Sequence, residues 1–392
     1  MSKRLLAVLF LLGLVAAACS SGSSDSKPSG PSGAGADGIR IGVEGPLTGD
    51  QGSYGQGMVE GAQFAADEIN AAGGLSGTKI TIVPIDDKAD ADTGVTAAKA
   101  AIDEGLDAVV GPYNSSVGVK TLPLYEDAGL VPVRFTTADT TAGLGVTVQP
   151  MTSQIAPVAT RALRTWLGAT KIVVIYDSTQ VYTKDANAAM KKAIAASGGS
   201  VVDDVAIEPG ADSYTAAVDE ALGTNPDAIY VITYYPEAGV IAREVAGRNS
   251  TVKCLADYSA FDSEYITAAT PAGVKRCPVV GLPGIDDFPG SASLVAKFRK
   301  SFGHDPGSQT PFAYDAVRVL AQAAGSKAGF AKNTLTDALL ALKAYEGWTG
   351  PITFEPETGN RVPALVVVDT VNADGILGID QNWAAAQGAS AG

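Results

Sequence analysis

Residues 39–71 read IRIGVEGPLTGDQGSYGQGMVEGAQFAADEINA, and this stretch decides the fold class. Its first residues have the β-branched and apolar pattern of a strand, which runs into a glycine-rich loop at residues 45–57. A pattern typical of a helix begins near the end of this loop. Apolar residues recur there at the 3.6-residue period of one helix face: Met58, Ala62, Ala65 and Ile69.

The same alternation of strands and helices continues along the chain. It runs to about residue 135, starts again after residue 170, and ends in two strand-like runs near the C-terminus. Alternating β and α units of this length predict parallel sheets covered by helices. We therefore expect an α/β fold with two doubly wound parallel-sheet lobes. Further strands are expected at residues 79–86, 106–111, 130–135, 171–178, 200–207, 226–233, 252–257 and 277–284.

The composition combines ample apolar residues with an acidic balance. Of the 392 residues, 46% are hydrophobic, and the formal net charge is −14. This length and apolar content suffice for two domains with full cores. Because a nucleic-acid backbone is a polyanion that attracts clustered Lys and Arg, an acidic chain without a basic run argues against a nucleic-acid partner.

The N-terminus has the features of an export signal. Lys3 and Arg4 precede an apolar run that ends in three alanines and Cys19. This cysteine is similar to the lipidated residue of bacterial lipoproteins, and an ordinary signal peptide with a chance cysteine is the alternative. We expect residues 1–18 to be a signal peptide, and residues 19–38 to be the lipidated cysteine and a flexible Gly/Ser/Pro-rich tether. The body is then held outside the cytoplasm, at the outer face of the cytoplasmic membrane.

Three polar loops follow predicted strands in the first half, at residues 45–57, 111–118 and 135–141. They consist of glycine, hydroxyl and backbone groups more than of titrating side chains. Ligands of open α/β sheets bind beyond the carboxyl ends of strands, and N–H groups at a helix start attract anions. Ser115 and Ser116 are therefore candidates for binding a carboxylate, with capping of the next helix as the alternative.

Signals for catalysis, metal binding and cofactor binding are weak. A serine nucleophile needs a base, and the one histidine of the sequence, His304, stands in a Gly/Pro-rich turn that we expect to be solvated. The acidic run at residues 86–92 lacks the spacing of a calcium loop, so we expect helix caps and a solvated loop there. No dinucleotide or P-loop motif is present. We predict a protein without metal or cofactor that is not an enzyme; an extracellular amidase-like hydrolase is the enzymatic alternative.

Aromatic side chains and one acid follow the strands of the second half. Tyrosine offers an apolar ring with a hydrogen-bonding tip, which suits a small amphiphilic ligand. Packing in the core is the alternative for these rings. The residues are Tyr182, Tyr234, Tyr235, Asp257 and Tyr258.

Cys254 and Cys277 are the two cysteines beyond the expected lipidation site. Export would bring them into an oxidising compartment, where paired cysteines form disulfides. A catalytic thiol, which needs a base nearby, is the alternative. We expect a disulfide.

Four stretches together are similar to a known family. Residues 45–74, 85–94, 109–116 and 125–133 resemble the Leu/Ile/Val-binding (branched-chain amino acid) family of periplasmic solute-binding proteins. The resemblance implies a type I binding-protein fold, in which two lobes joined by a three-strand hinge close on a small solute. It also implies a monomer that delivers this solute to an ABC permease. A sensor that presents its closed form to a membrane receptor is the alternative function.

The resemblance also implies a division of the chain into lobes. Each lobe is built from two separate segments because the chain crosses the hinge three times. The expected parts are residues 39–156 plus 281–361 for lobe 1, residues 157–280 plus 362–381 for lobe 2, and residues 382–392 for a C-terminal tail.

The resemblance further implies how the solute is held. A serine and the loop after the fourth strand would bind a carboxylate, tyrosines would form the walls, and an acid would bind an ammonium group. The residues at these positions are Tyr54, Ser115, Ser116, Thr136, Thr137, Tyr182, Tyr234 and Asp257.

The chain departs from the family pattern at two of these places. Ala138 stands where the family has Thr, and Tyr258 stands where it has the acid, with Asp257 one residue earlier. The expected ligand is therefore a branched-chain amino acid or a related small carboxylate. Arg134 is expected to be a solvated or surface-paired charge, with a contact to a second anionic group as the alternative.

Overall fold

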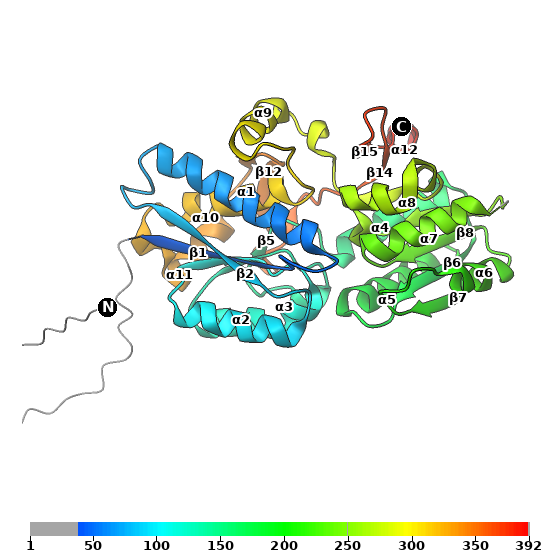
Figure 1. The fold of residues 1–392 in the computed structure, drawn as a ribbon, viewed down its shortest axis with the longest axis horizontal. Helices are drawn as coiled ribbons and strands as arrows, with labels where there is room; N and C mark the ends of the chain where they lie inside the picture. Colours follow the sequence, from blue (N-terminus) through cyan, green and yellow to red (C-terminus); the bar gives the residue numbers. More distant parts are fainter. Residues whose placement is uncertain (1–37, 249, 391–392) are drawn as a thin grey trace, which may run out of the picture. The chain divides into compact units, whose positions relative to one another are not determined.

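The structure, a computed structural model, describes residues 38–248 and 250–390 and contains two large sheets (Figure 1). The sheet of the first lobe has the strand order β2-β1-β3-β4-β5, and its strands are all parallel. Figure 1 shows α2 and α3 on one face of this sheet and α1 with α10 on the other. The strands are β1 (Ile39–Gly45), β2 (Ile80–Asp86), β3 (Ala108–Val110), β4 (Pro132–Arg134) and β5 (Val146–Thr147).

The helices of the first lobe come from both ends of the sequence. The N-terminal ones connect the strands, and the later ones return to the same sheet after the chain has passed through the second lobe. They are α1 (Gly52–Ala71), α2 (Ala91–Asp103), α3 (Ser115–Asp127), α9 (Ser291–Phe302), α10 (Thr310–Ala324) and α11 (Lys332–Ala341).

Helix α1 confirms the helical period of the opening stretch. Met58, Ala62 and Ala65 are fully buried, as the spacing predicts. Gly61 on the same helix lies so close to α10 that a Cβ atom there would be 2.2 Å from the carbonyl oxygen of Thr310. Glycine at this position therefore allows the two helices to pack together.

The sheet of the second lobe has the order β15-β14-β10-β9-β8-β6-β7. The five strands from β7 to β10 pair in parallel, while β14 and β15 are antiparallel. The predicted α/β class is thus confirmed, with an antiparallel edge added by the C-terminal segment. The strands are β6 (Lys171–Asp177), β7 (Ser200–Ile207), β8 (Ala228–Ile232), β9 (Lys253–Ala256), β10 (Val279–Gly281), β14 (Val367–Val371) and β15 (Leu377–Ile379).

The helices of the second lobe lie on both faces of its sheet. Helix α4 packs beside α5, and α7 packs between α6 and α8. These helices are α4 (Thr152–Arg161), which continues into a π-helical turn η2 (Ala162–Trp166), α5 (Val181–Ala196), α6 (Thr215–Gly223), α7 (Tyr235–Gly247), α8 (Ser263–Arg276) and α12 (Gln381–Ser390).

The chain passes between the large sheets three times, after β5, after β10 and after the third, smaller sheet. The expected boundary at residues 156–157 falls inside α4, and the expected tail begins inside α12, where Trp383 is buried. The small antiparallel sheet consists of β11 (Tyr345–Gly347), β12 (Gly350–Phe354) and β13 (Arg361–Val362). Short 3₁₀ turns are η1 (Asp139–Thr141), η3 (Tyr258–Ala260), η4 (Ile285–Asp287) and η5 (Lys327–Phe330).

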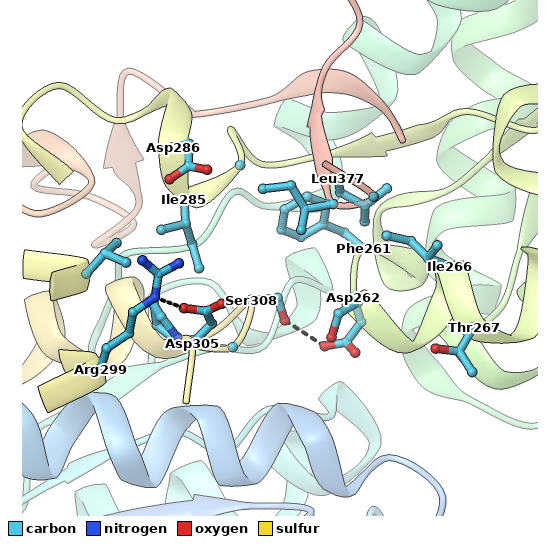
Figure 2. A pocket seen from close by; sticks show the side chains of 17 residues that line it. Phe261, Asp262, Ile266, Thr267, Ile285, Asp286, Arg299, Asp305, Ser308 and Leu377 are labelled. Atoms are coloured by element: carbon cyan, nitrogen blue, oxygen red, sulfur yellow. Dashed lines mark hydrogen bonds and ion pairs between the residues drawn. The ribbon is translucent and has the colours of Figure 1, made fainter. Parts of the chain in front are cut away.

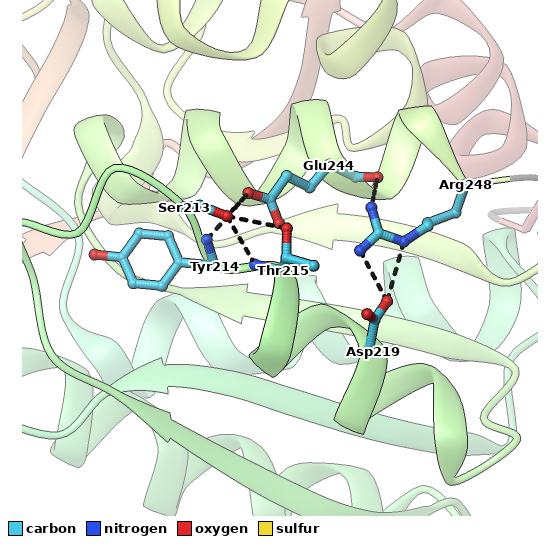
Figure 3. A network of polar contacts seen from close by, with 6 residues as sticks. All are labelled: Ser213, Tyr214, Thr215, Asp219, Glu244 and Arg248. Carbon is cyan, nitrogen blue, oxygen red and sulfur yellow. Dashed lines mark hydrogen bonds and ion pairs between the residues drawn. The ribbon is translucent and has the colours of Figure 1, made fainter.

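Helix α6 begins at a polar network on the surface of the second lobe (Figure 3). The N–H of Thr215 donates to Ser213 Oγ at 3.2 Å, and this hydroxyl donates to Glu244 of α7 at 2.8 Å. Arg248 then joins α7 to Asp219 of α6 at 2.8 Å. The network caps one helix and links it to the next within a single lobe.

A disulfide joins Cys254 of β9 to Cys277 beside β10, with the Cα atoms 4.6 Å apart. Within the described ranges, no helix is both long and apolar enough to cross a membrane. The predicted signal peptide, the lipidated Cys19 and the tether up to residue 37 lie outside the described residues.

Candidate functional site

A small cavity lies at the carboxyl ends of strands from both large sheets. Its volume is about 10 Å³, which is room for about one water molecule. The first lobe contributes two aromatic rings and two hydroxyl residues, and the second lobe contributes three tyrosines and a serine. The lining residues are Tyr113, Ser115, Phe135, Thr137, Tyr182, Tyr234, Tyr258 and Ser259.

The wall of the first lobe presents hydrogen-bond donors. Ser115 is the first residue of α3, whose N-cap is Asn114, and its hydroxyl oxygen accepts from the N–H groups of Thr137 at 3.3 Å and Ala138 at 3.2 Å. Two N–H groups and a hydroxyl therefore converge at the positive end of a helix, an arrangement that binds anions. The Ala at 138 does not weaken this arrangement, because the donor is its backbone N–H.

The wall of the second lobe presents aromatic rings with an acid behind them. Asp257 is 1% exposed and does not line the cavity. Its carboxylate accepts from the hydroxyls of Tyr182, at 2.5 Å, and Tyr230. Burial raises the pKa of Asp257 above its ordinary value. The acid thus acts as the centre of a buried hydrogen-bond cluster.

Tyr258 connects the cavity to the strands that join the lobes. Its hydroxyl donates to the side-chain oxygen of Gln149, which lies just after β5. The amide nitrogen of Gln149 in turn donates to Gln309 at 2.9 Å. The tyrosine that stands in place of the expected acid is therefore held in position by the hinge segment.

Tyr54 lies behind the cavity wall and does not line the cavity. Its ring stacks on Tyr113 with the centroids 4.3 Å apart, and its hydroxyl donates to the carbonyl of Ser259 at 2.5 Å. Burial is the main cause that raises the pKa of Tyr54. Tyr54 thus links the two lobes directly.

Ser116 and Thr136 also point away from the cavity. Ser116 Oγ accepts from the N–H of Val181 at 2.9 Å and donates to Gln180 at 2.8 Å, so it caps α5 of the other lobe. Thr136 Oγ1 pairs with Thr141 at 2.8 Å inside the first lobe. Of the eight residues predicted for the site, the structure brings Ser115, Thr137, Tyr182 and Tyr234 to the cavity.

Four lining residues were not among those predicted for the site. Tyr113 and Phe135 stand two positions before Ser115 and Thr137, which are themselves in the lining. Alternate residues of an extended segment point to the same side, and this period was the available signal. Tyr258 and Ser259 follow directly on Asp257 in the turn after β9. The resemblance pointed to position 258, but the acid one residue earlier was preferred, and Ser259 had no comparable signal.

Arg134 is fully buried, so both expectations for it are wrong. Its guanidinium donates to the carbonyls of Gly145 at 2.8 Å and Thr358 at 3.2 Å, and to Asn360 Oδ1 at 2.6 Å. Burial lowers the pKa of Arg134 to about 10. The C-terminal segment around residue 359 covers β4, and the arginine holds the two together.

The acidic run after β2 is only partly solvated. Asp90 caps α2 by accepting from the N–H of Thr93 at 2.8 Å, as expected for a cap. Asp87 is fully buried instead of solvated, and burial raises its pKa to about 7. His304 is exposed and pairs with Glu60 at 3.3 Å. Among the residues that the structure describes, no cluster of three or more His, Cys, Asp or Glu side chains is placed to hold a metal ion.

A larger cavity, of about 250 Å³, lies near the hinge (Figure 2). Its walls include Phe261, Ile285 and Leu377, with an ion pair between Arg299 and Asp305 at one side. At the other side, the buried Asp262 accepts from Ser308 at 2.7 Å and from Ser53 at 3.0 Å. Arg299, Asp305 and Asp262 are paired with one another or with protein hydroxyls. We place the candidate site at the small cavity because four of the predicted site residues line it.

Comparison with known proteins agrees with this fold. The chain is 26% identical over 334 residues to Leu/Ile/Val-binding protein homolog 1 of Brucella suis, a match that covers 84% of this chain and 89% of that protein. It is similar to the leucine binding protein LivK of Thermotoga maritima, with a TM-score of 0.79 and 25% identity over 87% of this chain and 97% of the other. It is also similar to LivJ of Streptococcus pneumoniae, a branched-chain amino acid transporter substrate binding protein in complex with isoleucine, with a TM-score of 0.77, 25% identity and the same coverages. Residues 38–375 match the family described as periplasmic binding protein, and the chain therefore belongs to this family.

Proposed function

We propose that the chain binds a small carboxylate-bearing solute between its lobes and supplies it to an ABC importer. One observation carries the proposal: the Ser115 hydroxyl and the N–H groups of Thr137 and Ala138 converge at the start of α3. These groups now bond to one another, and a carboxylate would offer them a charged acceptor. The neighbouring rings of Tyr182 and Tyr234 would enclose the rest of the solute.

The solute enters in our proposal by separation of the lobes. A cavity of about 10 Å³ does not admit an amino-acid-sized molecule without movement. The contacts that would break and re-form include Tyr54 with the carbonyl of Ser259 and Ser116 with the N–H of Val181. A solute that contacts both walls would favour the closed form by its differential affinity for that form.

The location and the partner follow in this proposal from the family and the N-terminal sequence. Membership of a periplasmic binding protein family supports a place outside the cytoplasm. Cys19 would carry the lipid that anchors the protein to the membrane, and residues 20–37 would be its tether. The similarity to LivJ, a transporter substrate binding protein, supports an ABC permease as the partner and solute delivery without chemical conversion.

Calorimetric titration of the purified protein with small carboxylates tests the proposal. At least one carboxylate should bind, and Ser115→Ala should weaken it about 10- to 100-fold, because a hydrogen bond to a charged group contributes about 1.5–3 kcal/mol. Thr136→Val is the matched control, since its hydroxyl is also buried, in the loop that contains Thr137, but faces Thr141. Equal affinity of Ser115→Ala and the unaltered protein would refute the carboxylate assignment, as would the absence of binding by every carboxylate.

A further inference from the structure

The polar groups of the cavity suit one half of an amino acid and not the other. A carboxylate accepts hydrogen bonds, and the first-lobe wall supplies donors for it. An α-ammonium group carries three N–H donors and a charge, so it needs acceptors and preferably a carboxylate. Whether the cavity offers such acceptors therefore decides the class of solute. This step rests on the proposed carboxylate site.

The lining holds no charged partner for an ammonium group. Among the described residues, the eight that line the cavity are tyrosine, phenylalanine, serine and threonine, without Asp or Glu. Burial of an unpaired charge is disfavoured by several kcal/mol. A zwitterionic amino acid would be paired at one end only.

The nearest acid is buried, and each of its oxygens already has a hydrogen-bond donor. The Asp257 carboxylate accepts from the hydroxyl of Tyr182 on one oxygen and from that of Tyr230 on the other, and the residue does not line the cavity. An ammonium group could reach Asp257 only by displacing a tyrosine hydroxyl that would itself remain buried.

The backbone carbonyls of the wall residues are engaged as well. The Ser259 carbonyl accepts from Tyr54, and the Thr137 carbonyl accepts from both the N–H and the hydroxyl of Thr152, at 2.8 and 2.9 Å. The Ser259 hydroxyl donates to the carbonyl of Thr233 at 2.9 Å. The Ser259 and Thr137 carbonyls are thus paired within the protein, as are the N–H groups that donate to Ser115 Oγ, and the lining offers a solute no carboxylate.

We propose that the solute is a small monocarboxylate with a neutral tail and no α-ammonium group. The aromatic rings of Tyr113, Phe135, Tyr182, Tyr234 and Tyr258 would surround this tail. Its apolar part gains by leaving water, and phenol rings tolerate a hydroxyl or carbonyl substituent on it. This inference deepens the proposed function and rests on it.

Matched ligands of one carbon skeleton test the inference on the unaltered protein. Leucine is compared by calorimetry with isocaproate, which lacks the amino group, and with α-hydroxyisocaproate, which has a hydroxyl in its place. Phenylalanine with phenylpropanoate and alanine with propanoate provide the same comparison for a larger and a smaller tail. In each set that binds, we expect the carboxylate without the ammonium group to bind at least about tenfold tighter than the amino acid, a difference of about 1.4 kcal/mol.

The outcomes separate this inference from the proposed function. If leucine or another amino acid binds as tightly as its analogue without the ammonium group, the solute class is wrong and the carboxylate site stands. Tighter binding of glycine betaine than of isocaproate would also overturn it, by showing that the rings hold a cation through their faces. If no carboxylate binds, the proposed function fails and the inference falls with it.

A single substitution should reverse the preference. Tyr258→Glu places a carboxylate in the cavity wall, where it can pair with an ammonium group. We expect the ratio of the affinity for leucine to that for isocaproate to rise at least about tenfold compared with the unaltered protein. Tyr258→Gln, of the same size without the charge, is the control and should produce no reversal. A folded Tyr258→Glu protein that still prefers isocaproate to the same degree would contradict the proposed position of the tail. The ligand series on the unaltered protein decides the matter if this variant does not fold.

Discussion

The two walls of the central cavity use polar groups in opposite ways. In the first lobe, the N–H groups of Thr137 and Ala138 both donate to the Ser115 hydroxyl oxygen, which lines the cavity at the start of a helix. In the second lobe, the polar groups are directed away from the cavity, because the hydroxyl of Tyr182 bonds to Asp257 and that of Tyr258 bonds to Gln149. Similar positions at strand ends thus form a binding surface in one lobe and a buried cluster in the other.

The two lobes also differ in how they accommodate a buried acid. Asp257 follows β9 and accepts from a tyrosine hydroxyl on each oxygen, whereas Asp87 follows β2 and accepts from the N–H of Ala89 at 2.8 Å, with its second oxygen unpartnered. Desolvation raises the pKa of both, to about 7 for Asp87. The comparison indicates that hydrogen-bond donors, more than burial, decide whether an acid stabilises its surroundings.

The largest expected effect comes from removing the acid of the second lobe. Asp257→Ala leaves the hydroxyls of Tyr182 and Tyr230 without their acceptor inside the core, so we expect a loss of about 4 kcal/mol in the free energy of unfolding. Urea denaturation measures it. Tyr230→Phe removes one donor only and should cost about 1 kcal/mol. A loss below about 1 kcal/mol for Asp257→Ala would show that the cluster contributes little to stability.

The acid of the first lobe should make stability depend on pH. A folded-state pKa near 7, above the unfolded value of about 3.9, means that the folded chain retains a proton that the unfolded chain has lost. The contribution of Asp87 to the free energy of unfolding is therefore most favourable below about pH 4 and declines as the pH rises toward 7. When the pH is raised from 5 to 8, the free energy of unfolding of Asp87→Asn should increase by about 2–3 kcal/mol relative to that of the unaltered protein.

Urea denaturation at the two pH values checks this expectation. The control is Asp90→Asn, because backbone hydrogen bonding lowers the pKa of the Asp90 carboxyl, which is therefore ionised throughout this range. If the difference in stability between Asp87→Asn and the unaltered protein is the same at pH 5 and pH 8, Asp87 does not retain its proton in the folded state.

The smallest expected effect separates a contact between lobes from one within a lobe. Ser116→Ala removes the cap of α5 across the lobes, and Ser213→Ala removes the equivalent cap of α6 within one lobe (Figure 3). Each should lower stability by about 1 kcal/mol. We expect only Ser116→Ala to weaken solute binding, severalfold, since its contact forms in the closed arrangement. Equal effects on affinity would argue against Ser116 as a contact that favours closure.

Much of the fold could be predicted because its signals are local. The period of Met58, Ala62 and Ala65 marks α1, and the polar loop after β3 marks the start of α3. Ser115 was found in the same way, since hydroxyl-rich loops at strand ends are visible in the sequence, whereas Thr137 was implied by the resemblance to the family. The burial of Arg134 was not predicted, because the segment that covers it lies more than 200 residues later in the chain.

The sequence by itself determined the order of strands and helices and the loops from which ligand contacts could come, because these depend on neighbours a few residues apart. Only the tertiary structure decided which of those residues face the cavity. Ser116 is diverted to cap a helix 65 positions away, and Asp257 is enclosed by tyrosines from two other segments. A side chain bonds to whichever partner the fold brings nearest, and partners distant in the chain leave no local pattern.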